Sequence, residues 1–240
     1  MKKKLIWIIP LAVIIVAVTS VVIYINIYYH ADSTALAALV SDDKVTVTET
    51  DYGWFFDGPS DDSALIFYPG GKVEETSYAP LLHRLAGEGI DVCLVKMPVR
   101  LAFLGINKAD SIIGMYDYDH WYIAGHSLGG VAASYYVSDN PGRIEGLILL
   151  ASYSTKKIPE SVKTVLIYGS EDKVLDLGKY NDNRSNIALC IGEVIIEGGN
   201  HAGFGNYGKQ DGDGQASISA EEQQTRTVEM IMQYMVSSGK

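Results

Sequence analysis

The fold is decided by Trp121-Tyr122-Ile123-Ala124-Gly125-His126-Ser127-Leu128-Gly129-Gly130, which joins an apolar strand-like run to a segment of small, helix-compatible residues. A serine on so sharp a turn takes strained dihedral angles, and glycines on both sides remove Cβ atoms that would collide with the strand and the helix. The G-x-S-x-G pattern in this context predicts an exposed nucleophile, Ser127, at the carboxyl edge of a sheet. An ordinary glycine-rich turn is the alternative.

Short continuous apolar runs, bounded by Gly, Pro or acidic residues, recur on both sides of this motif. Such runs are typical of strands covered on both faces, and they occupy residues 64–68, 92–95, 121–124, 147–150, 165–168 and 194–196. Helical periods separate several of them, and Ser219 with Glu222 predicts the capped start of a last helix. The alternation predicts an α/β fold with a mostly parallel, doubly wound sheet, preceded by a β-hairpin over residues 45–48 and 52–56.

With these motifs the chain resembles the α/β-hydrolase superfamily, most closely its small, lid-poor members of the dienelactone-hydrolase-like kind, the α/β-hydrolase family 5 type. The resemblance covers residues 64–235 and implies the α/β-hydrolase fold, with a triad in the chain order serine, acid, histidine. Dienelactone hydrolases proper use a cysteine as nucleophile. The serine at position 127 therefore implies a general esterase-like activity.

The resemblance implies that the base follows the last strand, and the chain has five histidines. Four of them precede the motif serine: His30, His83, His120 and His126. His201 remains, directly beyond the run at residues 194–196, where a neutral imidazole could accept the proton of Ser127 and return it to the leaving group. The alternative is a histidine on a surface loop.

The acid is expected in the turn after residues 165–168, Gly169-Ser170-Glu171-Asp172-Lys173-Val174, which looks like the turn that carries the carboxylate in this family. We choose Asp172, whose role would be to hold the His201 ring in the useful tautomer and to stabilise the imidazolium. Glu171 and Asp176 are the neighbours that compete with it, and a solvated acidic turn is the alternative.

Acyl transfer also requires hydrogen-bond donors aimed at the oxyanion. One is expected to be the backbone N–H of Leu128, the residue after the nucleophile, and the other to come from the loop Pro69-Gly70-Gly71-Lys72-Val73. Similarity to the family favours Gly71, with Lys72 as the near alternative. The family often has a His-Gly pair where this chain has Pro69-Gly70, which leaves the second donor open.

Charge argues against some classes of partner. The formal net charge is −10, and without the three lysines at positions 2–4 the chain carries 16 Lys and Arg against 29 Asp and Glu, or −13. A body this acidic repels phosphate backbones, so we expect no nucleic-acid partner. Asp211-Gly212-Asp213-Gly214 lacks the remaining spacing of a calcium loop, so we interpret it as a mobile loop beside His201 and expect neither a metal nor a cofactor.

The N-terminus predicts a membrane anchor. Residues 5–29 contain no charge and are long enough, as a helix, to cross a bilayer. Because the lysines precede this segment, it is expected to span the cell membrane once and to leave the following chain on the extracytoplasmic side. We therefore divide the chain into an anchor with its cytoplasmic lysines (1–30), a linker (31–44) and a catalytic domain (45–240).

Two other interpretations of this segment remain open. Ala35-Leu36-Ala37 resembles a signal-peptidase site, although the apolar stretch is much longer than the usual hydrophobic region of a cleaved signal. A buried core helix is the remaining alternative. The two cysteines, Cys93 and Cys190, could form a bridge in an oxidising compartment, and the sequence does not decide it.

The combined prediction is a serine hydrolase that cleaves carboxylic esters or thioesters. Residues 151–160 are too few for a lid domain, so the site is expected to be open to a small acyl group or to the end of a larger molecule near the membrane surface. A peptidase or acyltransferase on the same triad is one rival. A non-catalytic, membrane-anchored binding protein on the same scaffold is the other.

Overall fold

The computed structural model describes residues 2–60 and 62–236, so the last four residues of the predicted catalytic domain lie outside the described part. The described residues form one sheet of eight strands in the order β1-β2-β4-β3-β5-β6-β7-β8. The strands are β1 Thr46–Thr50, β2 Gly53–Asp57, β3 Ser63–Tyr68, β4 Asp91–Val95, β5 His120–His126, β6 Gly146–Leu150, β7 Lys163–Gly169 and β8 Cys190–Ile196.

The direction of the strands confirms the expected topology. From β4 to β8 every neighbouring pair is parallel, whereas β1 and β2 form an antiparallel hairpin and β2 pairs antiparallel with β4. The chain therefore has the mostly parallel sheet that its apolar runs predict and the α/β-hydrolase fold that the resemblance implies.

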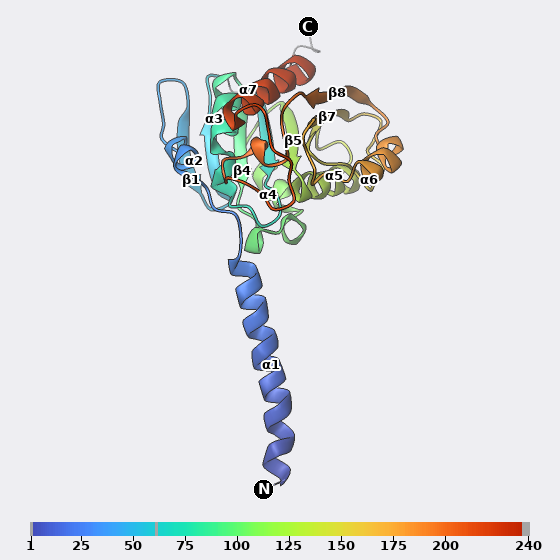
Figure 1. The fold of residues 1–240 in the computed structure, drawn as a ribbon. Helices are drawn as coiled ribbons and strands as arrows, with labels where there is room; N and C mark the ends of the chain where they lie inside the picture. Colours follow the sequence, from blue (N-terminus) through green and yellow to red (C-terminus); the bar gives the residue numbers. More distant parts are fainter. Residues whose placement is uncertain (1, 61, 237–240) are drawn as a thin grey trace.

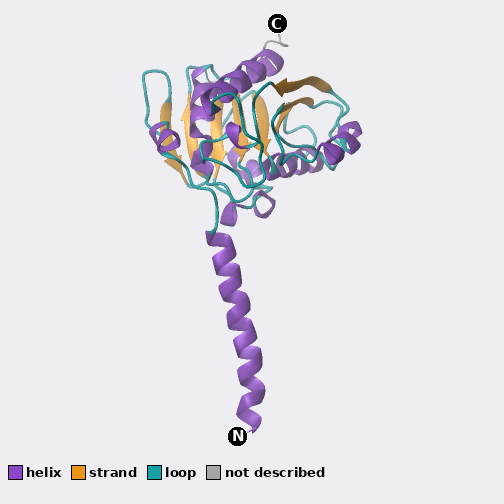
Figure 2. Cartoon of the chain, viewed as in Figure 1, coloured by secondary structure: helices purple, strands orange, loops and turns teal. Residues whose placement is uncertain are grey.

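Helices cover both faces of this sheet (Figures 1 and 2). The α-helices are α1 Lys2–Asn26, α2 Ser33–Ala37, α3 Ala79–Gly87, α4 Lys108–Ile113, α5 Leu128–Asp139, α6 Leu177–Asp182 and α7 Ala220–Ile231. The short 3-10 helices are η1 Glu75–Tyr78, η2 Pro98–Arg100, η3 Ala102–Leu104, η4 Arg184–Asn186 and η5 Ala202–Phe204, and η6 Met232–Val236 is a π-helix. Ser219 caps α7 as predicted, because its Oγ accepts the Glu222 N–H at 3.0 Å.

Two apolar cores explain why the strand sequences are continuously apolar. In β3, Leu65 and Phe67 belong to one core together with residues of α3 and α7. Ile66 and Tyr68, which alternate with them, belong to a second core with residues of α4, α5 and α6. Successive strand side chains point to opposite faces, so a strand covered on both faces has no polar face.

The N-terminal helix α1 projects away from the body (Figure 1), and its residues 9–26 are long and apolar enough to cross a membrane. Part of the segment predicted as a linker packs on the body. It contains α2, where the Asp32 carboxylate accepts the Ala35 N–H at 2.9 Å and Ala35 is buried. Both Cys93, in β4, and Cys190, in β8, are free thiols.

Candidate active site

Ser127 lies alone between the end of β5 and the start of α5, with φ 52° and ψ −123°. This is a region that non-glycine residues rarely adopt. Glycine is required on both sides. A Cβ added to Gly125 would lie 2.4 Å from the backbone carbonyl carbon of Gly129, and a Cβ added to Gly129 would lie 2.1 Å from the carbonyl oxygen of Tyr68. The motif therefore brings strand and helix so close that the Ser127 side chain is turned out of the sheet edge.

The strained turn is held by its neighbours. The Ser127 N–H donates to the Leu150 carbonyl at 2.9 Å, and the Ser152 hydroxyl donates to the Ser127 carbonyl at 2.8 Å. Ser127 itself lines a surface cavity of about 270 Å³ together with Leu128, Val131, Ala151, Ser152, Tyr153, Val174, Leu175, Asp176, Lys179 and His201. The predicted nucleophile and the predicted base thus share one cavity.

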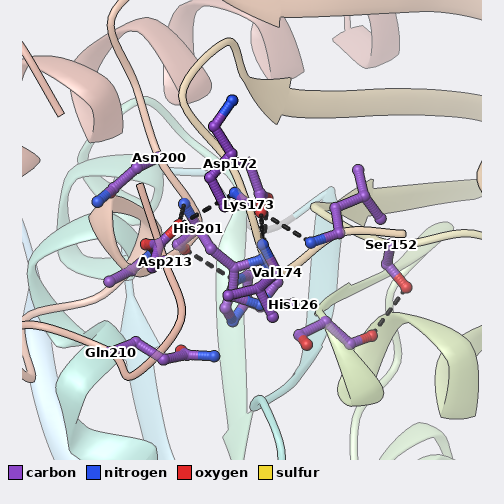
Figure 3. Close-up of polar contacts among 12 residues, drawn as sticks. His126, Ser152, Asp172, Lys173, Val174, Asn200, His201, Gln210 and Asp213 are labelled. Atoms are coloured by element: carbon purple, nitrogen blue, oxygen red, sulfur yellow. Dashed lines mark hydrogen bonds and ion pairs between the residues drawn. The ribbon is translucent and has the colours of Figure 1, made fainter. Parts of the chain in front are cut away.

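Asp172 and His201 meet because β7 and β8 are neighbours and their pairing continues beyond both strands. The Ser170 N–H donates to the Ile196 carbonyl at 3.0 Å, and the Glu171 N–H donates to the Gly199 carbonyl at 2.8 Å. His201 Nδ1 then lies 2.8 Å from Asp172 Oδ2, and both side chains are almost fully buried (Figure 3). Two residues 29 positions apart in the chain form one hydrogen-bonded pair.

The surroundings of Asp172 fix the histidine tautomer. Asp172 Oδ1 accepts the backbone N–H groups of Val174 and Leu175, each at 2.8 Å, which leaves Oδ2 to accept the proton of His201 Nδ1 (Figure 3). His201 Nε2 then carries a lone pair, and within the described residues it is buried without a hydrogen-bond partner, so it is not bonded to Ser127 in this structure. Such hydrogen bonds often tighten only when substrate is present.

The two competing acids have other contacts. Asp176 caps α6, where its carboxylate accepts the Lys179 N–H at 3.0 Å. The Glu171 carboxylate accepts from its neighbour Ser170 at 3.4 Å. Among the three acids of this turn, Asp172 is the one that contacts His201.

The two expected oxyanion donors lie against each other. A Cβ added to Gly71 would lie 2.8 Å from Leu128 Cδ2, so the loop after β3 touches the first residue of α5. The Lys72 N–H, the alternative donor, is already bonded to the Arg100 carbonyl at 2.9 Å. In the part of the chain that the structure describes, the amides of Leu128 and Gly71 donate to no protein group, which leaves both free for a ligand.

His126, which sequence reasoning set aside as a base, connects the two sides of the site. His126 Nε2 lies 3.1 Å from the His201 carbonyl and therefore donates to it, so Nδ1 accepts from the Tyr78 hydroxyl at 2.8 Å. That hydroxyl in turn accepts the Gly70 N–H at 3.1 Å. Burial lowers the pKa of His126 well below its ordinary value, and the nearby His201 lowers it further. Its position beside the nucleophile was the available signal.

Asp213 was also missed, because Asp211-Gly212-Asp213-Gly214 was interpreted as a mobile loop. Asp213 Oδ1 accepts the N–H of His201 at 3.2 Å and of Gly214 at 2.8 Å, and Oδ2 accepts the N–H of Ala202 at 2.9 Å (Figure 3). Its carboxylate therefore holds the backbone that carries the predicted base. No cluster of three or more His, Cys, Asp or Glu suited to a metal ion occurs among the described residues.

Comparison with solved structures supports the same fold. The chain is similar to Est1E from Butyrivibrio proteoclasticus (13% identity, TM-score 0.56, 80% of this chain and 99% of that one). It is also similar to a putative dienelactone hydrolase from Klebsiella pneumoniae (16%, 0.58, 80% and 100%) and to the thioesterase domain from the curacin biosynthetic pathway (12%, 0.54, 80% and 100%). No curated protein sequence matches the chain significantly.

The family model supplies the stronger result, since identities this low show the fold alone. The model of the alpha/beta hydrolase family matches residues 64–225, which contain the strained serine turn, the Asp172–His201 pair and the loop of Gly71. The match covers more than half of the chain. The chain belongs to the α/β-hydrolase family.

Proposed function

We propose that this hydrolase cleaves carboxylic esters or thioesters through an acyl-enzyme, with Ser127 as nucleophile, His201 as base and Asp172 as the orienting acid. The observation that carries the proposal is the buried Asp172–His201 pair at 2.8 Å: His201 lines the same cavity as the strained Ser127, and its Nε2 has no partner among the described residues. Esterase and thioesterase structures among those of similar fold agree with this reaction class.

The reaction would proceed in two halves. The Ser127 oxygen attacks the acyl carbon while His201 Nε2 accepts its proton, and the amides of Leu128 and Gly71 donate to the oxyanion. Collapse of the tetrahedral intermediate breaks the bond to the alcohol or thiol, which takes the proton from His201. Water then attacks the acyl-enzyme, with His201 again as base, and releases the acid and the free serine.

Membrane attachment is part of the proposal. We infer that α1 is an uncleaved, single-pass anchor with the lysines at positions 2–4 in the cytoplasm and the body, within residues 45–240, on the other side of the cell membrane. The support is its length, its lack of charge after position 4 and the absence of any buried residue among the described residues 9–26.

A fluorophosphonate probe tests the mechanism. Ser127→Ala is expected to abolish labelling, because the attacking oxygen is gone, and His201→Ala to slow labelling by about 10²–10⁴-fold, the usual scale of general-base assistance. The rate constants of labelling are measured for the full chain in detergent. Ser134→Ala and His120→Ala serve as matched controls, since the Ser134 hydroxyl donates within α5, to the Val131 carbonyl, and His120 bonds Glu145 at the surface. Equal labelling of all variants would contradict the mechanism.

A further inference from the structure

The segment that leaves α1 is bonded directly to the loop that carries the expected oxyanion donor. The Tyr29 N–H donates to the Lys72 carbonyl at 2.8 Å, and the Glu74 N–H donates to the Tyr29 carbonyl at 2.9 Å, so that Tyr29 and Val73 form a parallel bridge. Lys72 follows Gly71 directly in the chain. The chain just after the C-terminal end of α1 is thus bonded to the residue that follows the expected oxyanion donor.

The same segment is also bonded to the chain that follows His201. The Asp211 N–H donates to the Tyr29 hydroxyl at 3.1 Å, and the Asp32 N–H donates to the Asn206 carbonyl at 2.9 Å. The segment after α1 is therefore bonded to chain on both flanks of the site, to the loop of Gly71 and to the loop after His201.

An apolar surface stands beside the end of α1, and we name Val99, Phe103 and Leu104 the membrane-facing surface. The exposed fractions of these three residues are 41%, 40% and 61%. They lie on η2 and η3, the green segment next to the upper end of α1 in Figure 1. Exposed apolar side chains that gather in this way mark a contact with another molecule or with a membrane.

Two contacts between a cation and a tyrosine ring place this surface beside the C-terminal end of α1. The Arg100 guanidinium lies 3.3 Å from the centre of the Tyr28 ring, and Lys72 Nζ lies 4.4 Å from the centre of the Tyr24 ring. Tyrosines with basic residues at the end of an apolar helix are typical of the boundary between hydrocarbon and headgroups. The occupant that fits the surface is therefore a lipid bilayer, because α1 brings the bilayer to that level.

The membrane-facing surface and the Ser127 cavity are joined through helix α5. Phe103 packs edge-on against Tyr135 of α5, with ring centres 5.4 Å apart, and α5 begins at Leu128 of the cavity wall. The wall also presents apolar side chains, Val131, Val174 and Leu175, beside the polar Asp176 and Lys179. An acyl chain that leaves the bilayer beside η3 could thus follow α5 toward the apolar part of the cavity wall.

We infer that the substrate is an acyl ester of a membrane amphiphile, drawn from the leaflet that α1 enters, with its ester group at headgroup level. The inference rests on the proposed esterase function and adds the source of the substrate. The step is the one described above: the acyl carbon bonds to the Ser127 oxygen, the alcohol leaves with the proton from His201, and water releases a fatty acid.

The test compares two esters with the same leaving group. The full chain is reconstituted into vesicles of equimolar phosphatidylcholine and phosphatidylglycerol, and hydrolysis is measured for methylumbelliferyl oleate held in the bilayer and methylumbelliferyl acetate in water. In Phe103→Ser/Leu104→Ser the ratio of the oleate rate to the acetate rate is expected to fall about tenfold, because two apolar contacts with the leaflet are lost.

The matched control replaces an equally exposed apolar pair at the other end of the sheet. Leu189, which directly precedes β8, is 38% exposed, and Ile195, within β8, is 53% exposed. Leu189→Ser/Ile195→Ser is expected to leave the ratio at the wild-type value. An equal ratio in wild type and in the Phe103/Leu104 variant would overturn the inference, as would an equal loss in both double variants.

A second readout separates this inference from the proposed function. Leu104→Cys, in a Cys190→Ser background, is labelled with an environment-sensitive dye and is expected to shift to the blue on reconstitution, whereas Leu189→Cys is not. If the wild type cleaves neither ester and Ser127 is not labelled, the proposed function fails, while the dye still reports whether the surface meets lipid. Absence of a shift at Leu104 would refute the membrane contact itself.

Discussion

The two loops beside Ser127 are held in opposite ways. The His201 loop is fixed by side chains: Asp172 and Asp213 accept hydrogen bonds from the imidazole and from the backbone around it. The loop of Gly71 is fixed mainly through backbone bonds to the segment after α1 and to Arg100, with one side-chain bond from the Gly70 N–H to the Tyr78 hydroxyl. Proton transfer requires a fixed imidazole, whereas the other loop connects the site to whatever lies at the end of the helix.

Backbone strain follows the same division. Lys72, Val99 and Arg100 all have positive φ, at 58°, 44° and 58°, and all three lie on the side of the Gly71 loop. Apart from Ser127 and Ala151, no other non-glycine residue in the described chain has positive φ. Strain of this kind costs of order 1–3 kcal/mol per residue, persists only where the surrounding structure enforces it, and clusters at functional sites. The comparison shows one loop built for rigidity and one that retains strain beside an exposed apolar surface.

The largest effect is expected on the rigid side, at Asp213. Asp213→Ala removes the acceptor for the amides of His201 and Ala202, and displacement of the imidazole is expected to lower kcat about 10–100-fold. KM for a soluble ester is expected to change little, since Asp213 does not line the Ser127 cavity. Steady-state kinetics measure the two parameters separately.

The neighbouring acid supplies the control for this experiment. Asp211 lies in the same loop and is exposed, and the hydrogen bond at this position comes from its backbone N–H, so Asp211→Ala is expected to retain wild-type kcat. Asp213→Asn keeps one carbonyl acceptor, so its kcat is expected to lie between those of Asp213→Ala and Asp211→Ala. A rise in KM without a loss of kcat in Asp213→Ala would show that the residue does not position His201.

The part of the site that sequence predicts well is the part set by side-chain identity. The glycines around Ser127 have no room for a Cβ, and the position of His201 after the last apolar run matches the place where β7 and β8 pair. The apolar runs predicted the sheet for the same reason, because only apolar side chains can fill both of its faces.

The part that sequence did not predict depends on backbone groups. The Asp213 carboxylate accepts backbone N–H groups, which almost every residue has. The sequence around Asp213 therefore does not distinguish a loop that holds His201 in place from a mobile loop. Within residues 31–44, which the sequence predicts as a linker, the structure forms α2, and the Asp32 N–H donates to the Asn206 carbonyl of the body. Such long-range backbone bonds leave no periodicity and no motif.

An intermediate effect is expected at His126, which joins the two loops through Tyr78 and the His201 carbonyl. Burial lowers its pKa in the folded protein, whereas in the unfolded chain it returns to about 6.5. Below that pH the unfolded state binds a proton that the folded state does not, so the free energy of unfolding falls by up to about 1.4 kcal/mol per pH unit. Above it the contribution is fully present.

Denaturant unfolding of the protein in detergent between pH 5 and pH 8 measures this slope, with ~1.4 kcal/mol per unit as its limit. His126→Gln keeps an amide donor for the His201 carbonyl but cannot titrate, so its stability is expected to depend less on pH below about 6.5. The exposed His120 bonds Glu145, and His120→Gln is the matched control. Identical slopes for wild type and His126→Gln would show that this histidine is not the buried titrating group.

The smallest effect tests the strained side. Val99 is β-branched and exposed at φ 44°, a conformation that glycine adopts without penalty. Val99→Gly is expected to raise the free energy of unfolding by about 1 kcal/mol, because relief of the strain exceeds the entropy lost by the more flexible unfolded chain. Val40→Gly, at an exposed valine without positive φ, is expected to give no such gain.

The same variant removes an apolar side chain from the membrane-facing surface, so stability and function should change in opposite directions. Thermal unfolding in detergent is expected to shift upward for Val99→Gly, while the ratio of oleate to acetate hydrolysis in vesicles falls. If both quantities rose together, the strain at Val99 would serve no contact outside the molecule, and the difference between the two loops would reduce to local packing. If Val99→Gly gains stability and loses only the hydrolysis of the membrane-bound oleate ester, the strain at Val99 serves the contact with the bilayer.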